Sequence, residues 1–133
     1  MIDIEKIDHI GIAVKDAEAA AHFYEHILGI PVTERIERGT SRGAFVKVGG
    51  VDFELLENKD PNSAIARHIG KRGEGVQHIA LKVENIEAAM EALKKKGMVF
   101  IEGPRPGARG SIIAFLHPKS TYGVLMELVE RKD

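Results

Sequence analysis

An internal duplication is the feature that most constrains the fold of this chain. The segment His9-Ile-Gly-Ile-Ala-Val-Lys-Asp-Ala-Glu-Ala-Ala recurs 69 positions later as His78-Ile-Ala-Leu-Lys-Val-Glu-Asn-Ile-Glu-Ala-Ala. Further along, Glu54-Leu-Leu-Glu57 matches Glu127-Leu-Val-Glu130, and Ala44-Phe-Val matches Ala114-Phe-Leu. Because the matches keep the same order, and loop insertions account for the drift in spacing, we expect two copies of one structural unit.

The first copy is predicted to begin with a strand and a helix. Residues 8–14 alternate with period two, which indicates a half-buried strand with the face His9, Gly11 and Ala13 opposite the face Ile10, Ile12 and Val14. Asp16 is a suitable cap for a helix over 17–28, which Gly29 and Pro31 would end. The apolar stripe expected on this helix consists of Ala20, Phe23, Tyr24, Ile27 and Leu28.

The second copy repeats this pattern. Val83 closes its first strand, Asn85 caps the helix and Gly97 ends it, with an apolar stripe of Ile86, Ala89, Met90 and Leu93. Hairpins follow in both copies, through a tight Gly49-Gly50 turn in the first and the longer segment 117–123 in the second. The polar linker 58–74 contains a predicted short helix around 63–69.

The expected architecture is therefore α+β, with two tandem βαβββ modules over about 5–57 and 75–131. Each module is too small to bury a helix and a sheet alone, so we expect one domain over 1–133, with curved mixed sheets facing each other across a cleft that contains a metal.

Composition excludes several classes of protein. The net charge of −1 gives no overall field for nucleic acid or a membrane surface. No apolar run is long enough to span a membrane, and the N-terminus lacks the apolar stretch of a signal peptide, so a cytoplasmic location is expected. With no cysteine, a metal site would depend on His, Glu or Asp.

The duplicated strands place polar residues where apolar ones are expected. Glu127 interrupts a segment otherwise suited to a fully buried strand, and Glu54 occupies the equivalent position. An unpaired buried carboxylate costs several kcal/mol, so a cation or a proton should accompany it. A lone strand histidine is usually a hydrogen-bonded core or edge residue, but the repeat pairs His9 with His78. We therefore expect His9, Glu54, His78 and Glu127 to bind one ion such as Co²⁺, Ni²⁺, Mn²⁺, Zn²⁺ or Fe²⁺.

Other candidates are weaker. His22 and His26 have chelating spacing but no third ligand nearby, and His68 and His117 fall in expected loops. The glycine-rich segment 103–110 lacks the spacing of a dinucleotide-binding fingerprint. It is interpreted instead as a loop bending over the metal, with Arg105 or Arg109 available to an anion. The scattered cations fit either a solvated surface or a phosphate-rich ligand; they are Arg67, Lys71, Arg72 and Lys119.

Three segments resemble the vicinal oxygen chelate superfamily and, within it, the methylmalonyl-CoA epimerase family. They are the opening His-Ile-Gly-Ile-Ala-Val, the stretch 73–81, and above all Ile113-Ala-Phe-Leu-His-Pro-Lys-Ser-Thr-Tyr-Gly-Val-Leu-Met-Glu-Leu-Val129. The resemblance extends over nearly the whole chain. The His and Glu positions alone are shared with glyoxalase I, whereas the Lys-Ser-Thr segment is typical of the epimerases.

The resemblance implies a metal held by His9, Glu54, His78 and Glu127, with Co²⁺ ranked before Mn²⁺, Ni²⁺, Zn²⁺ and Mg²⁺. It implies an acyl-CoA substrate whose configuration at C2 is inverted through a metal-stabilised enolate, with Glu54 and Glu127 as catalytic acid/base residues, and a homodimer. Lys119 and Ser120 could contact substrate, and the scattered cations could meet the CoA phosphates.

One position departs from the epimerase pattern. Some epimerases have a further glutamate that acts as a catalytic base, on the strand before Phe45. This chain has Gly43 at that position, and Glu37 is the reserve candidate for the role. Two alternative functions remain open. A glyoxalase I-type lyase would use a similar set of four ligands, and a ligand-binding protein without catalysis would usually lack them. An extradiol dioxygenase would need only two His and one Glu and is commonly a longer chain.

Overall fold

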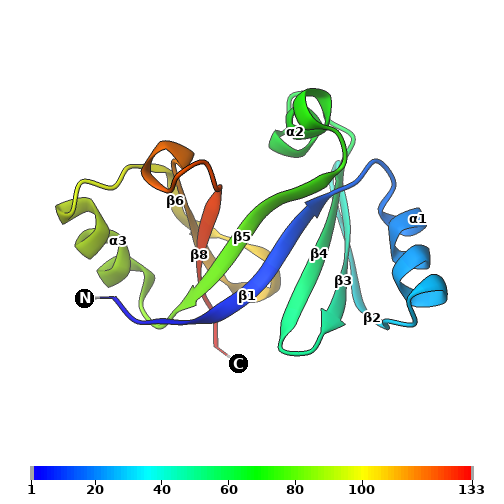
Figure 1. The fold of residues 1–133 in the computed structure, drawn as a ribbon, viewed down its shortest axis with the longest axis horizontal. Helices are drawn as coiled ribbons and strands as arrows, with labels where there is room; N and C mark the ends of the chain where they lie inside the picture. Colours follow the sequence, from blue (N-terminus) through cyan, green and yellow to red (C-terminus); the bar gives the residue numbers. More distant parts are fainter. Residues whose placement is uncertain (1, 133) are drawn as a thin grey trace. The chain divides into compact units, whose positions relative to one another are not determined.

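The computed structural model describes residues 2–132, which form two compact units (Figure 1). The first unit contains residues 9–77, and we call it the first module. The second unit combines residues 78–132 with the N-terminal residues 2–8, and we call it the second module. No helix among the described residues is long and apolar enough to cross a membrane.

The first module contains a four-stranded sheet with the order β2-β3-β4-β1. β1 runs parallel to β4, and the other neighbours are antiparallel. The elements in chain order are β1 (Ile4–Ala13), which belongs to this module from His9 on, α1 (Ala17–His22), η1 (Phe23–Ile27), β2 (Val32–Arg38), β3 (Ser41–Val48), β4 (Val51–Asn58) and α2 (Ala64–Arg72). The Gly49-Gly50 turn is confirmed between β3 and β4, with Gly49 at φ 62°.

The second module has the same topology, with the strand order β5-β8-β7-β6 and β5 parallel to β8. Its elements are β5 (Gly75–Val83), α3 (Ile86–Lys95), β6 (Phe100–Pro106), η2 (Ala108–Gly110), β7 (Ile112–Leu116), η3 (Pro118–Ser120) and β8 (Met126–Glu130). The prediction of two α+β modules with βαβββ order is confirmed. The prediction of a single domain over 1–133 stays a prediction.

Both predicted helix caps are confirmed. The Asp16 side chain accepts a hydrogen bond from the Ala19 amide at 3.0 Å, and Asn85 accepts one from the Ala88 amide at 3.0 Å. Such caps satisfy backbone donors that have no partner within the helix. In the linker, Ser63 caps α2 in the same way, and the helix runs beyond the predicted 63–69 to Arg72.

The apolar stripe predicted for the first helix is confirmed for Ala20 and Tyr24, which pack against the core, and wrong for its other three residues. The α-helix stops at His22 and continues as one π-helical turn, η1. A π-turn adds a residue and rotates the following side chains off the helix face. Phe23, Ile27 and Leu28 are consequently exposed, and the core instead receives the small residues Ala17 and Ala21.

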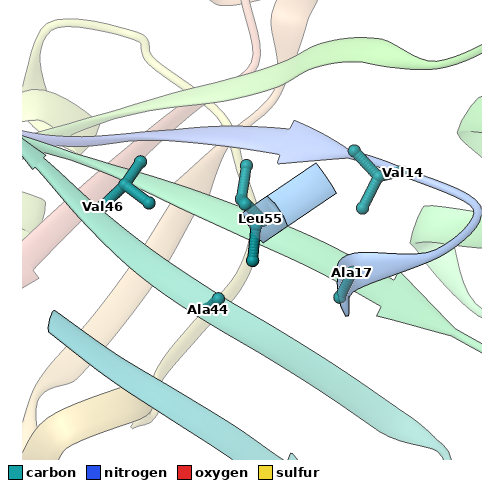
Figure 2. Packing of buried hydrophobic residues seen from close by; sticks show 6 residues of the cluster. Val14, Ala17, Ala44, Val46 and Leu55 are labelled. Atoms are coloured by element: carbon teal, nitrogen blue, oxygen red, sulfur yellow. The ribbon is translucent and has the colours of Figure 1, made fainter. Parts of the chain in front are cut away.

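Each module has its own apolar core. In the first, Leu55 is fully buried beneath α1 and packs with Val14, Ala17, Ala44 and Val46 (Figure 2). In the second, α3 presents the predicted stripe to the sheet, where Ile86, Ala89 and Met90 are buried beside Leu128 and Leu93 packs against them. Equivalent repeat positions, Leu55 and Leu128, therefore form the two core centres.

The interpretation of 103–110 as a loop is wrong in its first half. Residues up to Pro106 belong to β6, which pairs with β7 along the edge of the sheet. Arg105 donates to both carboxylate oxygens of Glu102 at 3.1 Å, so its guanidinium is already engaged by an acid. Arg105 therefore lies in a strand and is paired with Glu102, so it does not fit the predicted role of an anion-binding residue in a loop.

Candidate functional site

In the first module, two neighbouring parallel strands bring His9 and Glu54 together. Gly11 on β1 is paired with Glu54 on β4, and His9 lies two residues before Gly11 on the same face. His9 Nε2 lies 3.4 Å from Glu54 Oε1, and the side chains are 7% and 13% exposed. The side chains of His9 and Glu54 are therefore neighbours in the first module, as the prediction of a shared site requires.

The second module repeats the arrangement with a shorter contact. Ala80 on β5 is paired with Glu127 on β8, and His78 lies two residues before Ala80. His78 Nε2 lies 2.9 Å from Glu127 Oε1, and both side chains are at most 5% exposed. The His78 ring also meets Phe115 edge to face, with 5.5 Å between ring centroids. Edge-to-face contacts of this kind are a favourable arrangement of aromatic rings.

The correspondence extends along the row of paired residues that crosses each sheet. Phe45 on β3 is paired with Glu54, and Phe115 on β7 is paired with Glu127. Each glutamate is thus flanked by a small residue on one strand and a phenylalanine on the next. Because directly paired residues have side chains on the same face, we define the site face of each sheet as the face with its His–Glu pair.

The residues of the two site faces fit a divalent ion by their chemistry. Each pair offers one imidazole nitrogen and carboxylate oxygens, a mixed set that suits divalent transition metals. No buried side-chain nitrogen or oxygen of residues 2–132 lacks a hydrogen-bond partner. The four residues predicted as ligands are therefore present as two equivalent pairs, one per module.

Two further glutamates of the repeat have a structural role that the sequence did not reveal. Glu57 accepts a hydrogen bond from the Ala17 amide at 2.9 Å, and Glu130 accepts one from the Ile86 amide at 2.8 Å. Each ties the first residue of a helix to the last strand of its module. The sequence does contain a sign of this role. Glu57 and Glu130 lie three residues after Glu54 and Glu127, and residues three apart on a strand lie on opposite faces, so they must point away from the site face.

The weaker histidine candidates lie apart from these pairs. His22 and His26 are exposed and stack on each other, with 4.4 Å between centroids. His117 accepts a hydrogen bond from the Lys119 amide. Burial and the nearby Arg72 lower the pKa of His68 on α2. The structure does not place any of them in the strand rows that contain Glu54 and Glu127.

The reserve candidate Glu37 lies on the wrong face of its sheet. It is paired with Arg42, next to the Arg35–Ala44 pair on the face covered by α1, and its carboxylate is 3.9 Å from Arg42. Gly43 is on the site face, paired with Ile36 and Leu56. A Cβ atom at Gly43 would lie 2.8 Å from the Leu55 carbonyl oxygen, so this backbone excludes a side chain there.

The remaining predicted substrate contacts are at the surface. Lys119 is exposed in η3, and Ser120 Oγ accepts a hydrogen bond from the Val99 amide at 3.0 Å. Arg67, Lys71 and Arg72 are exposed on α2. Their predicted contacts with an acyl-CoA stay predictions.

Comparison with known proteins defines the family. Residues 6–128 match the model of the Glyoxalase/Bleomycin resistance protein/Dioxygenase superfamily, and the chain belongs to this superfamily. Human mitochondrial methylmalonyl-CoA epimerase is 41% identical over 131 residues, covering 95% of this chain and 74% of the human protein. An uncharacterised Bacillus subtilis protein, YqjC, is 37% identical over 132 residues, covering 97% and 94%.

A solved structure shows the same fold with an acyl-CoA ligand. A variant of Streptomyces coelicolor methylmalonyl-CoA epimerase in complex with 2-nitronate-propionyl-CoA superposes with a TM-score of 0.91 at 36% identity, covering 98% of this chain and 100% of that chain. The chain is thus an α+β protein of the glyoxalase-like fold and is homologous to methylmalonyl-CoA epimerases.

Proposed function

We propose that this protein is a metal-dependent epimerase that interconverts the two configurations of methylmalonyl-CoA at C2. The observation that supports this most is the duplicated His–Glu pair, placed at the same register position on the site face of each module. Similarity to methylmalonyl-CoA epimerases of human and Streptomyces coelicolor supports the choice of substrate.

The two pairs are proposed to act as one set of ligands, with His9 and Glu54 from one module and His78 and Glu127 from the other. Co²⁺ is the first candidate, followed by Mn²⁺, Ni²⁺, Zn²⁺ and Mg²⁺. When bound, the ion would supply a Lewis acid to oppose the negative charge that grows on the thioester oxygen as the C2 proton leaves.

The chain's own carboxylates would move the protons. Inversion needs one group that removes the C2 proton from one face and another that returns a proton to the opposite face. Glu127 and Glu54 are proposed for these roles, since the duplication presents a carboxylate on each site face.

Deuterium uptake tests the proposal. In D₂O, methylmalonyl-CoA should acquire deuterium at C2 while its configuration inverts. Glu127→Ala should stop the inversion and the deuterium uptake from the configuration whose C2 proton Glu127 removes. A chelator should abolish turnover, and Co²⁺ or Mn²⁺ should restore it. Turnover that is unaffected by the chelator would remove the metal from the proposal, and exchange from both configurations that survives Glu127→Ala would assign that base to another residue.

A glyoxalase I-type reaction is the second candidate, because position 54 has the glutamate found in glyoxalase I. Comparing methylmalonyl-CoA with the hemithioacetal of methylglyoxal and glutathione separates the two functions. The homodimer and the cytoplasmic location stay predictions.

A further inference from the structure

Another carboxylate besides Glu54 lies on the site face of the first module, on the edge strand β2. Glu34 is paired with Phe45, and Phe45 is paired with Glu54 on its other side. The three residues form one row across the sheet, with their side chains on the same face. Two strand spacings separate Glu34 from Glu54, about 10 Å between backbones.

A β-bulge turns Glu34 onto this face. Val32 is paired with Val46 in the core, but the next paired residue is Glu34 with Phe45, so Thr33 is the extra residue. The Thr33 hydroxyl donates to the Phe45 carbonyl at 3.2 Å and holds the bulge. Without the bulge, Glu34 would follow Val32 onto the face covered by α1. Bulges commonly re-aim side chains next to active sites.

The second module contains the same bulge, but its glutamate is bound. Phe100 is paired with Leu116 and Glu102 with Phe115, which repeats the Val32 and Glu34 pairings. Arg105 binds both oxygens of Glu102. Within residues 2–132, Glu34 has no such ion pair, and its side chain is exposed.

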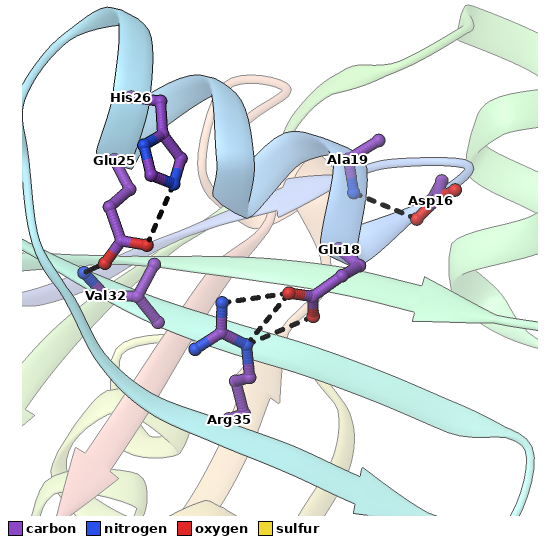
Figure 3. Close-up of polar contacts among 7 residues, drawn as sticks. All are labelled: Asp16, Glu18, Ala19, Glu25, His26, Val32 and Arg35. Carbon is purple, nitrogen blue, oxygen red and sulfur yellow. Dashed lines mark hydrogen bonds and ion pairs between the residues drawn. The ribbon is translucent and has the colours of Figure 1, made fainter.

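The nearby acids on the other face are also bound. Arg35 donates to both oxygens of Glu18 on α1 (Figure 3), and Arg42 lies near Glu37. Hydrogen bonds with an arginine stabilise the ionised carboxylate and oppose its protonation. No arginine of the described residues binds the Glu34 carboxylate in this way.

We infer that Glu34 is a proton-transfer residue that works beside Glu54, on the first-module side of the substrate. This inference rests on the proposed function. The C2 proton would pass to the Glu34 carboxylate, leaving its electron pair in the thioester enolate. A proton from Glu127 would then bond to C2 on the opposite face, and the reverse reaction exchanges these roles. In this refinement of the proposed function, Glu34 takes over the proton transfer assigned above to Glu54, which would then hold the ion. The exposed side chain of Glu34 is open to solvent.

Glu34→Gln tests the inference, with Glu37→Gln as the matched control on the same strand and the opposite face. Each configuration of methylmalonyl-CoA is incubated separately in D₂O, and deuterium at C2, epimerisation and Co²⁺ binding are followed. Glu34→Gln should lower kcat for epimerisation about a hundredfold with KM unchanged. Deuterium uptake should persist from one configuration and be lost from the other. Glu37→Gln should behave as the unsubstituted protein.

Three outcomes would overturn the inference. Epimerisation by Glu34→Gln at the unsubstituted rate would show that its carboxylate is not needed. Equal loss of exchange from both configurations together with lost Co²⁺ binding would show a structural role. Failure of the unsubstituted protein itself to epimerise or exchange methylmalonyl-CoA would refute the proposed function, and the inference with it.

Discussion

The two modules place the same donor atoms in the same register but hold them differently. In the second, His78 and Glu127 are 2.9 Å apart and at most 5% exposed. In the first, His9 and Glu54 are 3.4 Å apart, and Glu54 is 13% exposed. Strand pairing preserves the donor positions after duplication, while the packing around them has diverged.

The helices differ in the same direction. α3 is one continuous ten-residue helix with its apolar stripe buried, whereas α1 ends after six residues and continues as the exposed π-turn η1. Edge-strand acids differ as well, since Glu102 is bound by Arg105 and Glu34 is not bound by a cation of the described residues. The second module thus holds its His–Glu pair closer together and less exposed, whereas the first leaves Glu54 and Glu34 more exposed.

Substituting the two glutamates of the site should give the largest effect and separate the modules. Glu127→Gln keeps an oxygen ligand but cannot move a proton, so kcat for epimerisation should fall by about 10²–10⁴. Glu54→Gln should cost less, because an amide oxygen can still bind the ion and Glu34 remains. Steady-state kinetics at saturating Co²⁺ measures both. Equal losses would contradict the division of roles.

Truncating the two core centres compares the stability of the modules. Leu55 and Leu128 are 0% and 1% exposed, so Leu55→Ala and Leu128→Ala should each lower the free energy of unfolding by about 2–5 kcal/mol. Urea unfolding followed by circular dichroism measures the loss. A loss well below this range in one variant would show that the corresponding core collapses around the cavity.

Removing the carboxylates that hold the helix starts should have a smaller effect. Glu57→Ala and Glu130→Ala each leave one helix amide without its acceptor, which should cost about 0.5–2 kcal/mol. Glu57 is the more buried of the two, so its substitution should cost more, because water reaches the unpaired amide less easily. The same urea assay compares them, and the reverse order would contradict this account.

The smallest effect concerns the exposed Glu18–Arg35 pair of the first module. Hydrogen bonding from Arg35 lowers the pKa of Glu18 below its ordinary value. The pair therefore stabilises the fold at pH values above the ordinary carboxyl pKa, and this contribution disappears as the pH falls through the lowered pKa. An NMR titration should show the pKa of Glu18 rising in Arg35→Gln. An unchanged pKa would show that the pair does not form in solution.

The sequence predicted what depends on period and repetition. Strand alternation together with the duplication predicted that His9 and His78, and likewise Glu54 and Glu127, occupy equivalent strand positions. The helix caps followed from Asp16 and Asn85. These features depend on local backbone geometry, which a residue pattern reports directly.

The features that the sequence did not predict depend on tertiary packing. The π-turn at 23–27 and the bulge at Thr33 each insert one residue into a regular element, and a periodic pattern cannot show where that insertion falls. For this reason the periodic pattern predicts that Phe23 faces the core, although it is exposed, and does not predict that Glu34 lies on the site face. The segment 103–106 was interpreted as a loop because its glycine and prolines are unusual in a strand, but edge strands tolerate them.

Titration with Co²⁺ tests most directly whether the two His–Glu pairs act as one site. Isothermal titration calorimetry should give one ion per chain, and His9→Ala or His78→Ala alone should each weaken binding strongly, since each removes a ligand of the same ion. Two ions per chain, or binding that survives either substitution unchanged, would show that each module acts separately and would contradict the proposed shared metal centre.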